Sequence, residues 1–232
     1  MDLFYFPTLE ETSTQIQFSK EESKHISRVL RKKAGDQLQA TNGMGLEATI
    51  ELIEVSNYGV QGLVNETIEH SPLPYRLHLA IAPTKNNNRL EWFIEKATEI
   101  GIHRITPILC EHAERKIIKA ERLEKIMIAA LKQSQQFYLP QLSPLQNFNE
   151  FVANFPGGYI AHCKDDEKIH FKHAVQPKGD ILLLIGPEGD FSTQEIETAI
   201  INGYTTVSLG NQRLRTETAA LLGCLTVALK AQ

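Results

Sequence analysis

Short apolar runs alternate with helical segments from residue 77 onward, and this alternation limits the possible fold more than any other feature. Strand-like runs lie at 77–83, 104–109, 159–163, 181–185 and 205–209. Helices are predicted over 89–100, 120–136, 193–202 and 216–230. Because apolar strands separated by helices are typical of a parallel sheet covered on both faces, the pattern predicts an α/β domain.

The first part of the chain has a different pattern. The segments 37–41, 47–54 and 59–67 alternate apolar and polar residues, and Asn42-Gly43 supplies a turn between the first two. This pattern predicts a small β domain with one helix.

Two prolines, Pro72 and Pro74, lie between the β segments and the first apolar run of the α/β region. Proline interrupts helices and central strands, so this stretch has the composition of a linker. A chain of 232 residues is long enough for two small domains. We therefore expect a first domain over 1–72 and a second over 73–232.

Most of the positive charge of the first domain lies in one segment, although the whole chain has a net charge of −4. Lys24, Arg28 and Arg31, here called the basic ridge, have the spacing of one helical face, with Ile26, Val29 and Leu30 directed to the core. Two interpretations stay open. The ridge either contacts phosphates of a nucleic acid or is an ordinary solvated helix face.

The cysteines and histidines do not form a recognisable site. Cys110, Cys163 and Cys224 are far apart in the sequence, which favours buried free thiols over a disulfide framework. His170 and His173 lack a third ligand nearby, and we expect no structural or catalytic metal.

No apolar run approaches the roughly 20 residues of a membrane span. The first basic residue is Lys20, so the start of the chain lacks the charged and apolar parts of a secretory signal. We expect a cytoplasmic protein without a membrane partner.

Ligands of open α/β sheets bind beyond the carboxyl ends of the strands, so the loop that follows 181–185 is a candidate site. In this loop Gly186 and Gly189 allow close backbone approach, whereas Glu188 and Asp190 are negative and would repel a pyrophosphate. The chain also lacks the glycine pattern of dinucleotide-binding and P-loop proteins. A nucleoside with a positive or neutral substituent suits this loop better.

The loop at 209–219 is the second candidate, since it carries Arg213, Arg215, Thr216 and Glu217 between a strand and the last helix. A structural role is the alternative. Thr216 would then cap the helix, and Arg215 would form a salt bridge with Glu217 or Glu188.

Taken together, these loops resemble a known family. IGPEGDFSTQE at 185–195, followed by LGNQRLRTETAAL at 209–221, resembles the closing motifs of the SPOUT methyltransferases, and in particular the bacterial family that methylates uracil N(3) in 16S ribosomal RNA. HISRVLR at 25–31 is similar to the helix motif of that family's N-terminal PUA-like domain. RLEWFIEKATEIGIHRITPILCEHAERK at 89–116 and LKQSQQFYLPQL at 131–142 resemble its central motifs.

The resemblance implies a small N-terminal PUA-like β-barrel and a C-terminal α/β domain with a trefoil knot, working as a homodimer. It implies that three loops of the second domain bind S-adenosylmethionine. By the family's pattern, the cofactor residues are Ile185, Gly186, Pro187, Glu188, Gly189, Leu209, Gly210, Leu214, Arg215 and Thr216.

The resemblance also implies an RNA partner, either 16S ribosomal RNA or the assembled small ribosomal subunit. We expect the basic ridge to contact it, together with a second basic patch of Arg115, Lys116, Lys119 and Arg122. Arg215 is the first candidate for a catalytic role, orienting the base or stabilising its developing negative charge. Glu217 is a second candidate, as a general base or as a partner that holds Arg215.

Three positions depart from the family's pattern. Asp190 stands where the family has a second glycine after GPEG, and Lys132 and Gln136 replace the usual Glu and Arg of a central motif. Two other functions remain open. The chain could be a noncatalytic ribosome-binding protein, or a SPOUT methyltransferase that acts on another RNA base.

Overall fold

The computed structural model describes residues 2–56 and 58–232. The chain divides into two compact units: Met1–Pro72 with Leu131–Leu139, and Leu73–Ala130 with Pro140–Gln232. The sequence-based division differs from this one at 131–139, which it placed with the second domain. The segment joins the first unit because Tyr138 pairs with Met44 in a β-bridge and Phe137 stacks on His70, with ring centroids 3.8 Å apart.

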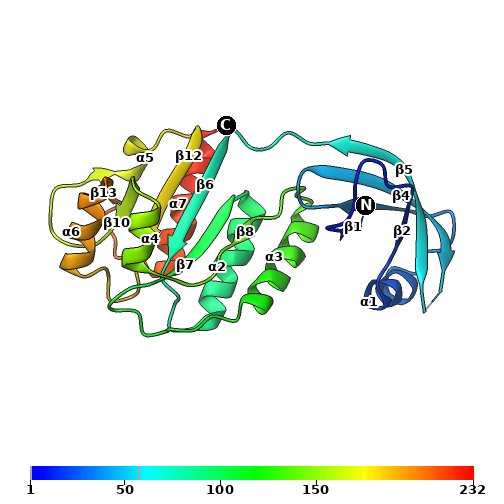
Figure 1. The fold of residues 1–232 in the computed structure, drawn as a ribbon, viewed down its shortest axis with the longest axis horizontal. Helices are drawn as coiled ribbons and strands as arrows, with labels where there is room; N and C mark the ends of the chain where they lie inside the picture. Colours follow the sequence, from blue (N-terminus) through cyan, green and yellow to red (C-terminus); the bar gives the residue numbers. More distant parts are fainter. Residues whose placement is uncertain (1, 57) are drawn as a thin grey trace. The chain divides into compact units, whose positions relative to one another are not determined.

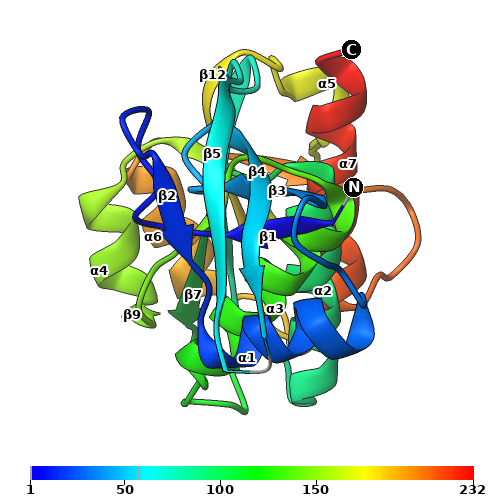
Figure 2. The same cartoon turned by 90° about the vertical axis from the view of Figure 1, so that its right-hand side faces the viewer.

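The first unit is built on a five-stranded sheet in the order β1-β3-β4-β5-β2. Its strands are β1 (Leu3–Tyr5), β2 (Gln15–Gln17), β3 (Gln37–Thr41), β4 (Leu46–Val55) and β5 (Val60–Glu69). β4 and β5 form a long antiparallel ribbon (Figure 2). The inward positions of the sheet, such as Leu38, Ile50 and Leu52, are fully buried and form the core with Phe4.

The helix of this unit is shorter than predicted. α1 (Lys20–Lys24) continues as a single π-helical stretch, η1 (His25–Val29), and Arg31 has a left-handed backbone with φ of 54°. A π-helix closes its hydrogen bonds over five residues, here from the N–H of Leu30 to the carbonyl of His25 at 3.0 Å. The prediction of one helical face is therefore wrong for Arg31, which lies beyond the helix.

The burial predicted for the same helix is correct in part. Ile26 is fully buried and Leu30 is half-buried, but Val29 is 66% exposed. The π-helical geometry changes the angle between successive side chains, so a pattern read at 3.6 residues per turn fails at its end.

The second unit contains a parallel sheet in the order β11-β13-β10-β12-β6-β7-β8, with β9 beside β7. Figure 1 shows its central strands β10, β12, β6 and β7. The strands are β6 (Tyr75–Ile81), β7 (Arg104–Leu109), β8 (Gln141–Leu142), β9 (Gln146–Asn147), β10 (Gly158–Ala161), β11 (Ile169–His170), β12 (Gly179–Ile185) and β13 (Tyr204–Ser208). The helices of the second half are α2 (Asn87–Ile100), α3 (Ala120–Ser134), α4 (Phe148–Asn154), α5 (Phe171–Ala174), α6 (Thr193–Ile201) and α7 (Thr216–Lys230). The predicted α/β domain with a parallel sheet is confirmed.

Helices cover both faces of this sheet, as the apolar strands require. α7 packs on β6 and β12, and α2 packs against α7. α4 packs against α6. Gly223 of α7 allows the close approach, because a Cβ at that position would overlap the side chain of Leu183. On the opposite face Ala80 and Leu184 belong to a buried cluster with Phe148 and Phe151 of α4. The central strands are thereby buried from both sides.

No helix in the described part of the chain is long and apolar enough to cross a membrane. The three thiols are free, and Cys110 and Cys224 are buried. Burial raises the pKa of the Cys224 thiol to about 12. Cys163 is exposed, so the prediction of burial is wrong for this residue. It lies in the loop just beyond the carboxyl end of β10, where the chain leaves the core.

Candidate functional site

A cleft of about 590 Å³ lies at the carboxyl edge of the parallel sheet. It is formed where the loops after β10, β12 and β13 meet, as expected from the convergence of parallel strands at this edge. Its volume is within the roughly 300–1,000 Å³ of typical small-molecule sites. We call it the carboxyl-edge cleft.

Most of the predicted cofactor residues line this cleft. They are Ile185, Gly186, Pro187, Glu188, Leu209, Gly210, Leu214 and Thr216. Gly189 and Arg215 are not among the lining residues. Gly189 instead lies against His112, whose Cβ would be 3.0 Å from an added side chain. Arg215 is exposed and occupies the N-cap position of α7, directly between the lining residues Leu214 and Thr216.

A buried hydrogen bond ties two of the loops together. The hydroxyl of Thr216 donates to the backbone carbonyl of Gly186 at 3.0 Å. Gly186 itself is tightly packed, because a Cβ would lie 3.0 Å from the ring of Phe191 and would require that ring to shift. Since buried polar groups need partners, this bond fixes the start of α7 against the loop after β12.

Asp190 ties the loop after β10 to the loop after β12. Its backbone is left-handed, with φ of 64°, the region that glycine occupies most readily. Its Oδ2 accepts a hydrogen bond from the N–H of Cys163 at 2.8 Å, and its Oδ1 accepts one from the N–H of Phe191 at 2.9 Å. The departure from the family's glycine thus adds a bridge between the loops after β10 and β12.

The loop after β10 was missed in the sequence analysis, and it carries the most unusual side chain of the cleft. His162 lines the cleft, its side chain is only 1% exposed, and neither ring nitrogen has a hydrogen-bond partner among the described residues. Burial lowers the pKa of His162, with a further contribution from Lys168. Its position at the carboxyl end of the strand-like run 159–163 was the signal that could have identified it.

Neither predicted partner of Arg215 contacts it. Within the described residues, the ion pair of Glu217 is formed with Arg89 of α2, with Nε 3.6 Å from Oε1. The side chain of Glu217 is only 9% exposed, lies outside the lining of the cleft, and leaves Oε2 without a hydrogen bond. The predicted salt bridge of Arg215 is therefore wrong, and Arg89 is a residue that the sequence did not single out.

The second basic patch is less available than predicted. Arg115 is half-buried, and its guanidinium donates to the carbonyls of Thr84 and Lys85 at 3.2 and 2.8 Å. Lys116 and Lys119 are exposed.

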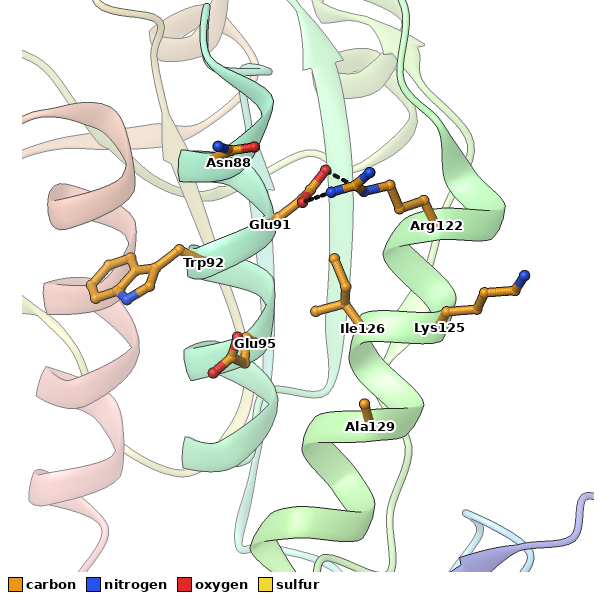
Figure 3. Close-up of a pocket in the computed structure, with 8 residues that line it drawn as sticks. All are labelled: Asn88, Glu91, Trp92, Glu95, Arg122, Lys125, Ile126 and Ala129. Atoms are coloured by element: carbon orange, nitrogen blue, oxygen red, sulfur yellow. Dashed lines mark hydrogen bonds and ion pairs between the residues drawn. The ribbon is translucent and has the colours of Figure 1, made fainter. Parts of the chain in front are cut away.

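Arg122 of the same patch is held by Glu91 in a pair with Nε 2.7 Å from Oε1. This pair spans a groove of about 500 Å³ between α2 and α3, from which Trp92 points away (Figure 3). None of the predicted cofactor residues lies in this groove.

The other two departures from the family's pattern lie in the segment that joins the first unit. The ammonium group of Lys132 lies 4.8 Å from the centre of the Phe4 ring, the geometry of a cation–π contact. Gln136 lies just after α3, and its N–H donates to the carbonyl of Leu131 at 3.1 Å. The described residues include no group of His, Cys, Asp or Glu side chains that could hold a metal ion.

The folds and the cleft are those of an RNA-modifying methyltransferase with a separate β domain. Residues 71–228 match the family model of the RNA methyltransferase domain, and residues 18–62 match that of the RNA methyltransferase PUA domain. The chain belongs to the family whose curated members are named ribosomal RNA small subunit methyltransferase E. The member from Bacillus subtilis is 32% identical, over 97% of this chain and 93% of its own length.

Solved structures show the same fold. A probable rRNA-methyltransferase from Porphyromonas gingivalis is 37% identical with a TM-score of 0.91, covering 99% of this chain and 98% of its own. A methyltransferase from Legionella pneumophila, solved with the bound cofactor SAM, is 29% identical with a TM-score of 0.85 and covers 97% and 96%. The predicted combination of a PUA-like and a SPOUT-type domain is confirmed.

Proposed function

We propose that this protein methylates N(3) of a uracil in 16S ribosomal RNA, with S-adenosylmethionine as the methyl donor. The observation that carries the proposal is the carboxyl-edge cleft, in which eight of the residues expected from the family's motifs lie together. The names of the relatives support ribosomal RNA of the small subunit as the substrate.

The chemistry of the cleft fits this cofactor. His162 places two buried ring nitrogens without hydrogen bonds at its wall, with only the carboxylate of Asp166 at 3.8 Å from Nε2, and such groups call for a hydrogen-bonding ligand. Glu188 and Asp190 also line it, and their carboxylates suit the positive groups of the cofactor. At Gly210, where φ is 127°, the nearest atom to an added Cβ would be Gln212 Oε1 at 3.9 Å, so the backbone there is open to close approach by a ligand.

When bound, S-adenosylmethionine supplies an electrophilic methyl group on its sulfonium. The residues of this chain must then align the uracil and remove the proton from N(3). We propose that Ile185, Gly186, Leu209 and Leu214 hold the cofactor through backbone and apolar contacts. The Thr216–Gly186 bond keeps their two loops at a fixed separation.

We propose that Arg215 acts on the uracil. Its side chain is exposed beside the cleft, and the described residues supply it with no ion-pair partner, so it is available to a carbonyl oxygen that gains negative charge. Glu217 is the candidate acceptor for the N(3) proton because Oε2 is unpartnered while Arg89 holds Oε1.

We also propose that the protein works as a homodimer in the cytoplasm and binds 16S ribosomal RNA or the assembled small subunit. Large apolar side chains are exposed on α2 and α7, among them Trp92, Leu225 and Leu229, which supports a further contact surface. The basic ridge and the exposed Lys116 and Lys119 are proposed RNA contacts, since phosphates require such charges.

Calorimetry with S-adenosylmethionine and its demethylated product tests the cofactor, and mass mapping of 16S ribosomal RNA from a deletion strain tests the target. We expect binding of both compounds and loss of one methyl group on a uracil. A folded protein that binds neither compound at millimolar concentration would be a noncatalytic RNA-binding protein. Loss of a methyl group from another base would replace the proposed substrate.

A further inference from the structure

A second cavity, of about 630 Å³, lies at the amino edge of the parallel sheet. Arg76 and His78 of β6 line it, with Asp180 of β12 and Arg104 of β7. The strand register places them together, because Arg76 lies opposite Asp180 and His78 lies opposite Arg104. Since the strands are parallel, this amino-edge cavity and the carboxyl-edge cleft are at opposite ends of the same strands.

The two arginines of the cavity differ in their partners. Arg76 forms a bidentate pair with Asp180, with distances of 2.6 and 2.8 Å, so its charge is balanced. Arg104 donates from both Nε and Nη2 to the amide oxygen of Gln141, at 3.0 and 2.5 Å. An amide orients the guanidinium but does not neutralise it. Among the described residues, Arg104 therefore brings an unbalanced positive charge to the cavity.

Two histidines at the cavity, His78 and His103, have lowered pKa values to which the charge of Arg104 contributes. Burial, together with the positive charges of Arg104 and His103, lowers the pKa of His78 to about 4. His103 is exposed at the cavity, and its pKa is lowered by burial and then by Arg104 and Arg76, against an opposing effect of Asp180. Because Asp180 balances Arg76 and a neutral amide holds Arg104, the side chains around the cavity carry a net positive charge, in a protein whose net charge is negative.

The walls restrict what can enter. His78 is held by a hydrogen bond between Nε2 and the hydroxyl of Thr106 at 2.8 Å and packs edge-on against Phe151 and Phe155. Gly158 has φ of 122° and no room for a side chain, because a Cβ would lie 2.8 Å from the carbonyl oxygen of Leu182. The floor is therefore fixed before a ligand arrives, which lowers the cost of binding.

We propose that the amino-edge cavity binds a phosphate group of RNA, with Arg104 and His103 as its ligands. Arg104 keeps N–H donors on Nη1 and Nη2 that Gln141 does not take, and a phosphate can accept from these and from the exposed imidazole of His103. That the phosphate belongs to RNA rests on the proposed function. The anion site itself rests only on the geometry and charge of the cavity.

Sulfate tests the anion site without RNA or cofactor, because it keeps its charge between pH 8 and pH 6. Imidazole resonances of His103 should shift and saturate as sulfate is added. Affinity should rise as the pH falls, since a bound anion favours protonated His103, while Arg76, Arg104 and Asp180 keep their charges and His78 stays neutral. The absence of any shift at high sulfate concentration would overturn the proposal.

Two variants should change sulfate affinity in opposite directions. Arg104→Gln removes the unbalanced charge and should weaken binding by roughly fivefold, the upper range for an exposed ion pair. Asp180→Asn keeps a hydrogen-bonding partner for Arg76 but removes the competing negative charge, so it should strengthen binding. Lys125→Gln, at an exposed cation of α3, is the matched control and should change nothing. Equal effects of Arg104→Gln and Lys125→Gln would show a nonspecific charge effect and overturn the site.

A second experiment measures binding of fragments of 16S ribosomal RNA and compares it with binding of a mononucleotide. Arg104→Gln should lower the slope of log affinity against log salt by about 1, the value for one phosphate contact, and leave affinity for S-adenosylmethionine unchanged. If sulfate binds but RNA affinity does not change, the site holds an adventitious ion only. If the mononucleotide binds tighter than RNA, the assignment to RNA is wrong. The sulfate measurements do not depend on the proposed methylation activity, because a protein without that activity can still bind sulfate in this cavity.

Discussion

Asp190 and Cys163 join two loops of the carboxyl-edge cleft, through a hydrogen bond of 2.8 Å from the backbone N–H of Cys163 to Oδ2. The same carboxylate accepts from the N–H of Phe191, and Asp190 has a positive φ that would suit glycine. Two opposing effects therefore meet at one residue. Relief of backbone strain favours glycine, and the hydrogen bonds favour aspartate.

We expect the hydrogen bonds to be the larger effect. Asp190→Gly should lower the free energy of unfolding by about 2 kcal/mol, because each of the two bonds to the charged group contributes about 1.5 kcal/mol at this partly exposed position and the relieved strain is about 1 kcal/mol. Urea denaturation measures this change, and affinity for S-adenosylhomocysteine should fall with it. Asp190→Asn keeps an acceptor oxygen and should lose less. A more stable glycine variant would show that strain dominates.

Replacement of His162 should separate binding from stability. His162→Phe removes two buried, unpartnered nitrogens, so the ligand-free protein should melt at the same or a higher temperature. Cofactor affinity should nevertheless fall by about 3- to 10-fold, the value of one hydrogen bond. His162→Asn and His162→Gln restore an amide near Nδ1 or Nε2, and the variant that recovers affinity identifies the nitrogen used. Unchanged affinity in a folded His162→Phe would exclude contact with the cofactor.

Arg215 should act on the rate of methyl transfer. Arg215→Ala is expected to slow single-turnover methylation by about 10²-fold, which corresponds to a few kcal/mol, with little change in cofactor affinity. Glu217→Gln provides the comparison, since it retains the shape of the side chain and should slow the reaction only if Oε2 accepts the proton. Equal loss of stability and cofactor affinity in Arg215→Ala, with a normal rate at saturation, would make the residue structural.

The basic ridge should contribute to RNA binding through charge alone. Replacement of Lys24, Arg28 and Arg31 by Ala should lower the slope of log affinity against log salt by up to about 2 to 3 units. Arg31 lies outside the helix, so its single variant should be measured separately from Lys24→Ala. A slope that does not change in the triple variant would assign these residues to the solvated surface.

His78 should make stability depend on pH. Its pKa is about 4 in the folded protein and about 6.5 when unfolded, so below pH 6.5 the unfolded chain binds the proton and the folded one does not. Stability is therefore lost as the pH falls from 6.5 toward 4, by up to about 3 kcal/mol. Denaturation of His78→Gln should show a flatter pH dependence. His173→Gln, at an exposed histidine of α5, should retain the original slope.

The sequence by itself determined the main helices and strands of the second unit. It also determined that the loops after β12 and β13 lie at one edge of the sheet. The strand predicted over 104–109 is β7 (Arg104–Leu109), and the helix over 216–230 is α7 (Thr216–Lys230). These elements follow from local hydrophobic periodicity. Parallel strands end at a common edge, so the loops at 185–190 and 209–216 had to converge.

Only the tertiary structure decided which side chains face one another. The pair of Arg89 with Glu217, 128 residues further along the chain, depends on the packing of α2 against α7. The burial of His162 without a hydrogen bond depends on how the three loops of the cleft pack, and the position of 131–139 depends on contacts with Met44 and His70. Such relationships arise from long-range packing, which local patterns of residues do not specify.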